Sequence, residues 1–580
     1  MAHVEPERID EILGRDIARR AKVKALLVVG VHRLGSKYVV EMRAIDPERD
    51  RYLFTVKEES PGKEGLLTVI DRLSERTRRE LGDEPSEEID ASRIAVGEAL
   101  TMNLEAYQHY VRGLDLNAHY GEFASAVKEW RRALELDPNL ATAHRMLAYA
   151  LGWYNRPAEA AAHARAALAS AARMPEKDRT IVLAMDALDK DDRAKAIHLA
   201  EQLAARYPDD KTSQFVAAQV LSGAGELQRA EAAFRRALQL DAGYICALGD
   251  FARLLDDSGR VAEAIRFARA GVAARPTAAN TAILAWATAT GGNVEEAVAL
   301  AREAIRLDGG ASLFVPFWTY QVLAYVGRPD EAERELRRLS LQGATDEERG
   351  AGSLWLASLQ ANLGKRQDAL RALSALPPTG PVLRAQVLGI GWPRLQAIEA
   401  LQFVRSLEQA YWLAPELAFR GDFVAAARTA SKLSEGSPPQ ALYRALLLEH
   451  ENRREESIEA LRTIAAAAVR PPTRFFEAQV LYLLGEVLLA ADRPAEAIEA
   501  MKPLRGINTT WGGWFEVAEN WPRAVLVRAQ AYERLGQISD AVGELDGLLA
   551  TWKNADPDLP LLADARAMRA RLGPIAAVAR

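Results

Sequence analysis

The sequence contains almost no cysteine. Cys246 is the single one among 580 residues, so the chain cannot form an internal disulfide. Cysteine-poor chains are typical of reducing compartments, and we expect the protein in the cytoplasm; the alternative is the extracytoplasmic part of a larger membrane-anchored system. Long hydrophobic runs are also missing, because residues 25–31 form the longest near the N-terminus and a membrane helix needs roughly 20 residues. We therefore expect no membrane insertion by this chain.

Neither sign of charge is in excess. Lys and Arg together number 74 and Asp and Glu 80, which gives a formal net charge of −6. A nucleic-acid-binding protein usually has a basic face or stripe. The densest basic cluster here, Arg76, Arg78 and Arg79, is flanked by Glu75 and Glu80. This alternation is typical of a solvated helix face, so we expect no nucleic-acid partner.

Motifs of catalysis and cofactor binding are absent. Neither the phosphate loop G-x-x-x-x-G-K-[ST] nor the dinucleotide loop G-x-G-x-x-G occurs. The histidines include no H-E-x-x-H pair and no zinc-ligand spacing with cysteine. The sequence allows His144 and His163 to face each other across one hairpin, but we interpret them as partly exposed helical histidines. Residues 32–34, His-Arg-Leu, lack the aspartate of a kinase catalytic loop. We predict no catalytic residue, no cofactor and no metal.

Two kinds of periodicity define a small head at the N-terminus. Apolar residues at spacings of three and four predict helices, and β-branched or alternating runs bounded by turn residues predict strands. The order is α-β-β-β-α over about residues 5–82. The predicted helices are residues 8–21 and 65–81, and the predicted strands are residues 25–32, 37–45 and 51–57.

A short pattern recurs after residue 120: a turn residue, then an apolar or aromatic residue, then a small anchor residue, usually alanine. The first seven intervals between anchors are 33 to 37 residues, which is the period of a helix–turn–helix repeat. The later intervals are 57, 31, 40 and 44 residues, so the second part of the array is irregular. The anchors are Ala126, Ala160, Ala196, Ala230, Ala264, Ala297, Ala332, Ala369, Ala426, Ser457, Ala497 and Ala541.

Other positions keep the same phase. A second small residue often follows seven positions after the anchor, because two helices that cross closely need small side chains where they touch. Pro138, Pro208 and Pro276 follow and are predicted to end the second helix. One hairpin cannot bury its apolar face alone, so neighbouring hairpins must stack. The second small residues are Ala133, Ala167, Ala237, Gly271 and Ala304.

Two segments carry a resemblance to tetratricopeptide repeats. They are residues 120–138, YGEFASAVKEWRRALELDP, and residues 225–241, GELQRAEAAFRRALQLD. The resemblance is strong over residues 105–345 and looser over residues 346–572. It implies a mostly α-helical solenoid of about 12 hairpins, a fold that binds other proteins.

The head carries a second resemblance. Residues 25–40, ALLVVGVHRLGSKYVV, with the Asp-Pro turn and third strand that follow, resemble the latter half of the TolB-amino-terminal-like domain. In bacteria that domain often precedes tetratricopeptide arrays, including those of membrane-anchored serine/threonine kinases and regulatory proteins. The front half of the domain has no counterpart here. The resemblance therefore implies either a reduced head or the tail of a larger or split system.

Together these patterns predict five segments. Residues 1–82 form the α/β head and residues 83–103 a linker. Residues 104–376 form the regular array, residues 377–395 a Pro/Gly-rich break, and residues 396–575 an irregular array.

Partner-binding residues are predicted on the first helix of each hairpin, because these helices line the concave wall of a solenoid, which holds extended peptides or partner helices. Counting back from the anchors selects aromatic, arginine and glutamine side chains. Aromatic residues and arginine dominate interface energies. The alternative is that the aromatic ones pack between hairpins. The selected residues are Arg145, Tyr149, Trp153, Phe215, Gln219, Arg253, Trp286, Phe317 and Gln321.

A second candidate surface lies in the irregular array. Trp511, Trp514, Phe515 and Trp521 occur in one stretch that is predicted to run from a loop into a helix. An exposed aromatic patch of this kind would be a binding site. The alternative is a lid over the end of the core.

These observations predict a non-enzymatic interaction scaffold or adaptor that binds a peptide or helix of a partner protein in the concave groove. Two alternatives stay open. One is a regulatory or sensory module of a bacterial kinase or transcription-regulator system, in which the head docks the module. The other is an enzyme with an unrecognised site between head and solenoid. The ends of a solenoid also allow a homo-oligomer.

Overall fold

The computed structural model describes residues 11–20, 23–63, 65–82, 101, 103–118, 123–153, 157–190, 192–309, 314–343, 346–374, 381–405, 413–433, 435–468, 477–504 and 514–573. The chain divides into two compact units at Leu183 and Ala184, apart from two short stretches before that point. We call them the N-terminal unit and the C-terminal unit and describe each by itself. Within the described residues, no helix has the length and apolar character needed to span a membrane.

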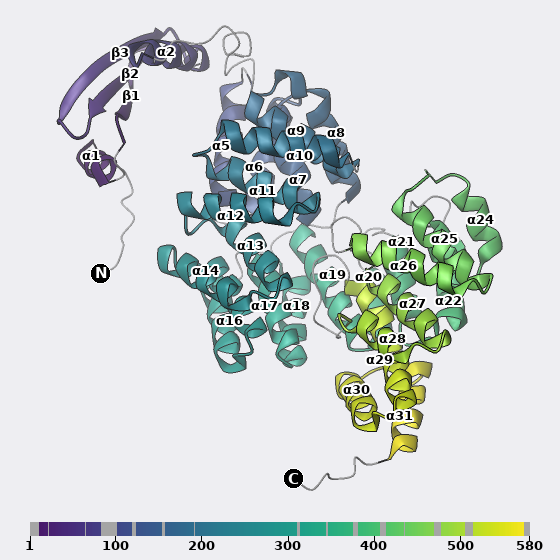
Figure 1. The fold of residues 1–580 in the computed structure, drawn as a ribbon. Coiled ribbons are helices and arrows are strands. Elements are labelled where there is room, and N and C mark those ends of the chain that lie inside the picture. Colours follow the sequence, from purple (N-terminus) through teal and green to yellow (C-terminus); the bar gives the residue numbers. More distant parts are fainter. Residues whose placement is uncertain are drawn as a thin grey trace. The chain divides into compact units, whose positions relative to one another are not determined.

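The N-terminal unit begins with the head (Figure 1). Its strands form an antiparallel sheet in the order β1-β2-β3. A two-residue turn, Gly35 and Ser36, joins β1 to β2, and Gly35 has the positive φ of 66° that a type II′ turn needs at its first position. The predicted α-β-β-β-α order is confirmed. The elements are α1 (Glu11–Arg20), β1 (Leu26–Leu34), β2 (Lys37–Asp46), β3 (Arg51–Ser60) and α2 (Leu66–Glu80).

Helix α2 covers one face of the sheet. Val40 of β2 and Val56 of β3 pack on that face against Val69 and Leu73 of α2, and all four are buried. The helix residues are spaced four apart, so they lie on one side of α2. Burial of this small apolar cluster holds helix and sheet together.

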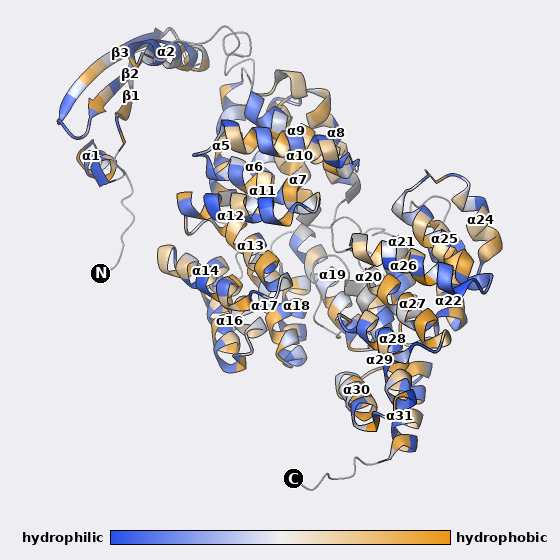
Figure 2. Cartoon of the chain, in the orientation of Figure 1, coloured by the Kyte–Doolittle hydropathy of each residue, from blue (hydrophilic) through white to orange (hydrophobic). Residues whose placement is uncertain are grey.

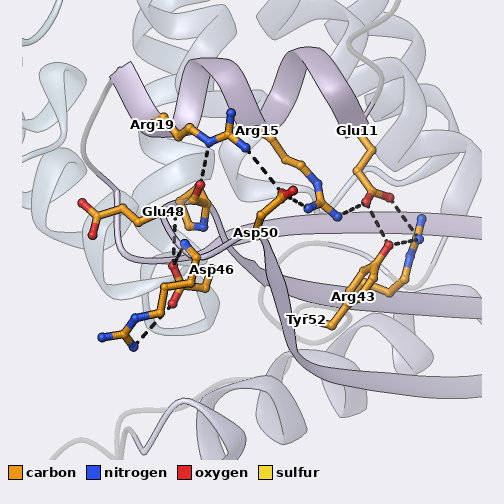
Figure 3. Close-up of polar contacts among 10 residues, drawn as sticks. Glu11, Arg15, Arg19, Arg43, Asp46, Glu48, Asp50 and Tyr52 are labelled. Atoms are coloured by element: carbon orange, nitrogen blue, oxygen red, sulfur yellow. Dashed lines mark hydrogen bonds and ion pairs between the residues drawn. The ribbon is translucent and has the colours of Figure 1, made fainter.

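Polar contacts attach α1 to the sheet (Figure 3). Arg15 pairs with Glu11 of its own helix and with Asp50 in the turn between β2 and β3. Glu11 also accepts a hydrogen bond of 2.9 Å from the Tyr52 hydroxyl and lies 3.0 Å from the Arg43 guanidinium. The bond from Arg15, followed by that from Tyr52, holds the pKa of Glu11 below its usual value. Ion pairs and hydrogen bonds therefore attach α1 to the sheet.

Helices in hairpins make up the rest of the N-terminal unit. Most of them carry hydrophobic and hydrophilic residues together (Figure 2), as expected of helices with one packed face. The helices are α5 (Leu104–Ala118), α6 (Phe123–Leu136), α7 (Ala141–Trp153), α8 (Pro157–Ala169), a short 3₁₀ helix (Ala171–Arg173) and α9 (Glu176–Asp189), whose second half belongs to the C-terminal unit.

The C-terminal unit continues with hairpins to the end of the described chain. The segment predicted as a Pro/Gly-rich break, residues 377–395, contains α21 and the start of a short 3₁₀ helix, Arg394–Gln396. The helices are α10 (Arg193–Arg206), α11 (Lys211–Gly223), α12 (Leu227–Leu240), α13 (Ile245–Asp257), α14 (Val261–Ala274), α15 (Ala278–Thr290), α16 (Val294–Asp308), α17 (Phe314–Tyr325), α18 (Pro329–Gln342), α19 (Asp346–Asn362), α20 (Arg366–Ser374), α21 (Pro381–Gly389), α22 (Ile398–Arg405), α23 (Leu413–Phe419), α24 (Phe423–Ala430), α25 (Pro438–His450), α26 (Arg454–Ala468), α27 (Glu477–Ala490), α28 (Pro494–Met501), α29 (Trp514–Arg534), α30 (Ile538–Thr551) and α31 (Pro560–Leu572).

The anchor residues lie where helices meet. All of them except Ala160 are 0% exposed, and Ala160 is half-buried. The second small residues are buried too, and at Gly271 even a Cβ atom would come closer than 3.0 Å to Leu248. Helices α6, α10 and α14 end two residues before Pro138, Pro208 and Pro276. The predicted contact positions and helix ends are confirmed.

In the nine hairpins whose turns the structure describes, from the anchor Ala230 to the anchor Ala541, a left-handed residue joins the two helices five positions before the anchor. Its φ lies between 58° and 89°, which favours glycine, asparagine or aspartate. The same turn occurs in both parts of the array, so the irregular intervals arise outside it: the 57-residue interval also contains α21 and α22, and α29 is 21 residues long. The residues are Gly225, Gly259, Gly292, Gly327, Gly364, Gly421, Asn452, Asp492 and Gly536.

The last helices of the C-terminal unit fold back onto its middle, and we call this the fold-back. Helix α29 packs against α19 and α21. Trp552, 1% exposed, donates its indole N–H to the carbonyl of Asn362 at 3.1 Å. The backbone N–H of Asp556 bonds to the carbonyl of Gly364 at 3.0 Å, and that of Leu561 to Gly391 at 2.9 Å. These contacts join residues nearly two hundred positions apart.

Candidate functional site

Helix α7 carries the predicted binding residues of the N-terminal unit. Arg145 and Tyr149 are half-buried. The Arg145 guanidinium donates to Asp178 of α9 at 2.9 Å, so this cation already has a carboxylate partner within the unit. Trp153 is the last residue of α7, and its side chain lies outside the described residues. His144 and His163 face each other between α7 and α8, with 2.8 Å between their Nδ1 atoms.

The predicted residues of the C-terminal unit lie on the first helices of their hairpins, at matching positions. Gln219 is half-buried, and the other five are only 3–7% exposed. Their aromatic rings pack against the rings of neighbouring residues, as Phe317 does against Trp355 at 5.2 Å between ring centres. Because these side chains are buried, a partner protein can contact few of them unless the hairpins separate. The five are Phe215, Arg253, Trp286, Phe317 and Gln321.

A cluster of polar and aromatic side chains joins four of these helices, α11, α13, α15 and α17. The Gln219 amide donates to Asp250 at 2.9 Å, and the Arg253 guanidinium lies over the rings of Trp286 and Trp318, at 5.8 and 5.4 Å from their centres. Burial raises the pKa of Asp250 to about 6, against the opposing effects of Gln219 and Arg253. Asp250 was not among the predicted residues, although it precedes Arg253 by three residues and therefore lies on the same side of α13.

The predicted aromatic patch is described only in part. Trp511 and the side chains of Trp514 and Phe515 lie outside the described residues. Trp521 is 4% exposed and meets the ring of Trp552 edge-on at 6.2 Å. Trp521 thus packs within the fold-back, an arrangement that agrees with the lid interpretation for this residue.

The fold-back borders a cavity of about 910 Å³ that is open to solvent, which we call the fold-back cavity. Its wall is formed by the turns after α17 and α19 on one side and by α28, α29 and α30 on the other. The aromatic residues Tyr325, Trp521 and Tyr532 contribute to this wall. Only Trp521 was singled out by sequence, because the other lining residues come together through contacts that local sequence patterns do not predict.

Charges of both signs line the fold-back cavity. Arg528, 5% exposed at its side chain, donates to the carbonyls of Met501 and Leu504 at 2.9 and 3.0 Å and pairs with Glu544 at 2.7 Å. Lys365 pairs with Glu333 at 2.6 Å. These contacts hold the wall in shape.

Two further features of the wall bear on ligand binding. Burial, with the nearby Glu544 and Asp540 carboxylates, raises the pKa of Tyr532, so this hydroxyl keeps its proton as a hydrogen-bond donor. Gly543 and Gly547 of α30 border the cavity with open space where a Cβ atom would lie. Among the residues that the structure describes, no group of three or more His, Cys, Asp and Glu could hold a metal ion.

Two family models match the chain, and both describe tetratricopeptide repeats. One covers residues 181–245 and the other residues 221–287. The chain therefore contains tetratricopeptide repeats, as the resemblance implied. A search of curated proteins finds no match.

Solved structures of tetratricopeptide-repeat proteins are also similar to the chain. A thermophilic one from Thermus thermophilus is 16% identical, with 38% of this chain and 99% of that one covered and a TM-score of 0.24. One from Parabacteroides merdae is 10% identical, with coverages of 52% and 99% and a TM-score of 0.28. The P58(IPK) tetratricopeptide domain is 12% identical, with coverages of 69% and 99% and a TM-score of 0.17. These TM-scores are too low to indicate how the hairpins of this chain are arranged, so that arrangement is defined by the chain's own contacts.

Proposed function

We propose that this protein is a non-enzymatic interaction scaffold, and that its C-terminal unit binds a short peptide or helix of a partner protein in the fold-back cavity. Tetratricopeptide repeats generally mediate protein–protein interactions. That general role is the basis of the proposal, and the fold-back cavity is the site that we propose for it.

The size and chemistry of the fold-back cavity carry the proposal. Its volume of about 910 Å³ lies at the upper end of the range in which proteins bind compact ligands. Aromatic rings offer apolar contact at low entropic cost, and backbone groups of a peptide find both donors and acceptors in a wall with charges of both signs. A peptide side chain of either charge meets a complementary group there.

The predicted groove residues of the regular array have a different part in the proposal. Arg253, Trp286, Phe317 and Gln321 are too buried to be a first contact, so we assign them to packing between hairpins. Gln219 remains a candidate for contact with a partner, since it is half-buried beside Asp250.

Filling the fold-back cavity tests the proposal. The double variant Gly543→Leu/Gly547→Leu places two side chains in the open space of the wall, and Gly543→Ala/Gly547→Ala is the matched control, because both pairs favour the helix but alanine fills little volume. Peptides are first selected from a displayed random library on the wild-type protein. Their affinities for all three proteins are then measured by fluorescence polarisation.

The leucine variant should bind the selected peptides at least tenfold more weakly than the alanine variant, a difference of about 1.4 kcal/mol. Equal affinity for both variants would place the binding site elsewhere. A library that yields no binder to the wild-type protein would speak against peptide binding itself.

A further inference from the structure

Strand β1 forms an open edge of the head's sheet. No other strand among the described residues pairs with its outer side. In an antiparallel hairpin, every second residue of the outer strand directs its N–H and C=O away from its partner. Counted from the pair Leu34 and Lys37, which closes the two-residue turn, these residues include Val31, Val29 and Leu27. The edge therefore offers backbone donors and acceptors centred on Val29.

The same three residues expose apolar side chains. Leu27 is 43% exposed, Val29 55% and Val31 58%. They lie opposite Ala44, Met42 and Val40 of β2 and thus on the face that α2 covers. The contacts of α2 are mainly with β3 and β2, so the apolar stripe on β1 stays in solvent.

The two edges of the sheet differ in how they are protected. Edge strands usually avoid pairing through inward charges, proline or bulges. Residues 26–32 of β1 contain no proline and no Lys, Arg, Asp or Glu, and their register with β2 is uninterrupted. Strand β3 at the other edge has a register shift, which leaves Leu53 without an opposite residue on β2. Only the β1 edge is regular and apolar enough to accept another strand.

We propose that two copies of this chain pair through β1, antiparallel, about a two-fold axis at Val29. Val29 then lies opposite Val29, and Leu27 of each copy opposite Val31 of the other, so every exposed apolar residue of the stripe meets another. Arg33 lies opposite Ala25, and Lys24 opposite Leu34, so no like charges meet. The six-stranded sheet that results is closed by its symmetry and leaves the β3 edges outside.

A second copy fits this edge because the pattern is symmetric about Val29. Apolar side chains stand two positions to each side, and the basic residues Lys24 and Arg33 lie beyond the stripe at both ends. A self-complementary strand of this kind places backbone hydrogen bonds and side-chain contacts in the same register.

Cysteine cross-linking tests the register. The background variant Cys246→Ser removes the one native thiol. Directly opposite residues of a hydrogen-bonded antiparallel pair have Cα atoms about 5.5 Å apart, within the range of a disulfide. Val29→Cys should therefore form a covalent dimer on mild oxidation, whereas Val31→Cys should not, because its counterpart lies four positions along the strand.

The molecular mass of the full chain in solution, measured by light scattering, provides a second test. The wild-type protein should have twice the monomer mass, and Val29→Lys should reduce it to the monomer with an unchanged circular dichroism spectrum. Leu53→Lys, an apolar-to-basic change of similar exposure on the other edge, should stay dimeric.

Two results would overturn the proposal: a wild-type monomer with no cross-link in Val29→Cys, or a dimer that Val29→Lys leaves intact. Equal cross-linking of Val29→Cys and Val31→Cys would overturn the two-fold axis.

Discussion

Replacing Glu519 with glutamine should destabilise the C-terminal unit by about 3–5 kcal/mol. Glu519 lies on α29 and is 2% exposed at its side chain. Its carboxylate accepts hydrogen bonds from Arg420 at 2.8 and 3.2 Å and from Arg523 at 3.1 Å. Glutamine keeps the shape but removes the charge that both guanidinium groups face.

The magnitude follows from the charges in this cluster. Arg420 and Arg523 are 0% and 2% exposed, and Glu416 is the other nearby carboxylate. Burial raises the pKa of Glu416 above its usual value, although Arg420 opposes this. In the variant, two buried cations share one carboxylate, and breaking a buried ion pair costs about 3–5 kcal/mol because a charge is left uncompensated.

The position of the cluster determines where the loss should appear. Arg523 also donates to the carbonyls of Trp392 at 2.9 Å and Gly389 at 3.2 Å, so the cluster ties α29 to α21 and to α23. Urea unfolding gives the total loss, and amide hydrogen exchange locates it. Exchange should rise in α21, α23 and α29 and stay unchanged in α15.

Two comparisons make the result decisive. Glu456→Gln breaks an exposed pair with Arg453 and should leave the urea midpoint almost unchanged, because water screens this pair. Arg420→Met/Glu519→Leu removes one cation and one anion together and should recover most of the loss. If Glu519→Gln costs no more than Glu456→Gln, the cluster does not hold the fold-back.

Other residues give simpler tests. Burial raises the pKa of Asp250 to about 6, so the folded chain binds this proton more tightly than the unfolded one. The urea midpoint of the wild-type protein should therefore fall as the pH rises from about 4 to about 6, with a loss of stability of at most about 3 kcal/mol. Asp250→Asn should abolish this pH dependence. Gly271→Val should cost about 1–3 kcal/mol by overpacking against Leu248, and an unchanged urea midpoint would contradict the close helix crossing. Trp552→Ala should cost about 3–5 kcal/mol and speed amide exchange at the turn after α19, whereas unaltered exchange there would contradict the fold-back.

Much of the fold could be predicted from local pattern. The anchors, such as Ala230 and Ala541, are small because two helices touch there, and contact of that kind recurs with the period of the hairpin. The strands of the head follow from alternation and turn residues within a few positions of one another. Such features depend on neighbours in the chain, so the sequence displays them directly.

The candidate site was less accessible to sequence reasoning. The positions of Arg253 and Trp286 on the first helices were predicted, but their burial was not, because it depends on how tightly adjacent hairpins stack. Helix α15, for example, packs against α13, α14, α16 and α17. Its few polar side chains give no sign of which face stays in solvent.

The sequence by itself determined the hairpin, its turn and its repetition, since each needs only residues within about 34 positions. Only the tertiary structure decided that Trp552 would meet Asn362 and that Arg420 would meet Glu519. These pairs are separated by 190 and 99 positions, and the connections between hairpins set the path that brings them together. Small changes in those connections redirect every later hairpin, which is why the fold-back and its cavity leave no periodic trace in the sequence.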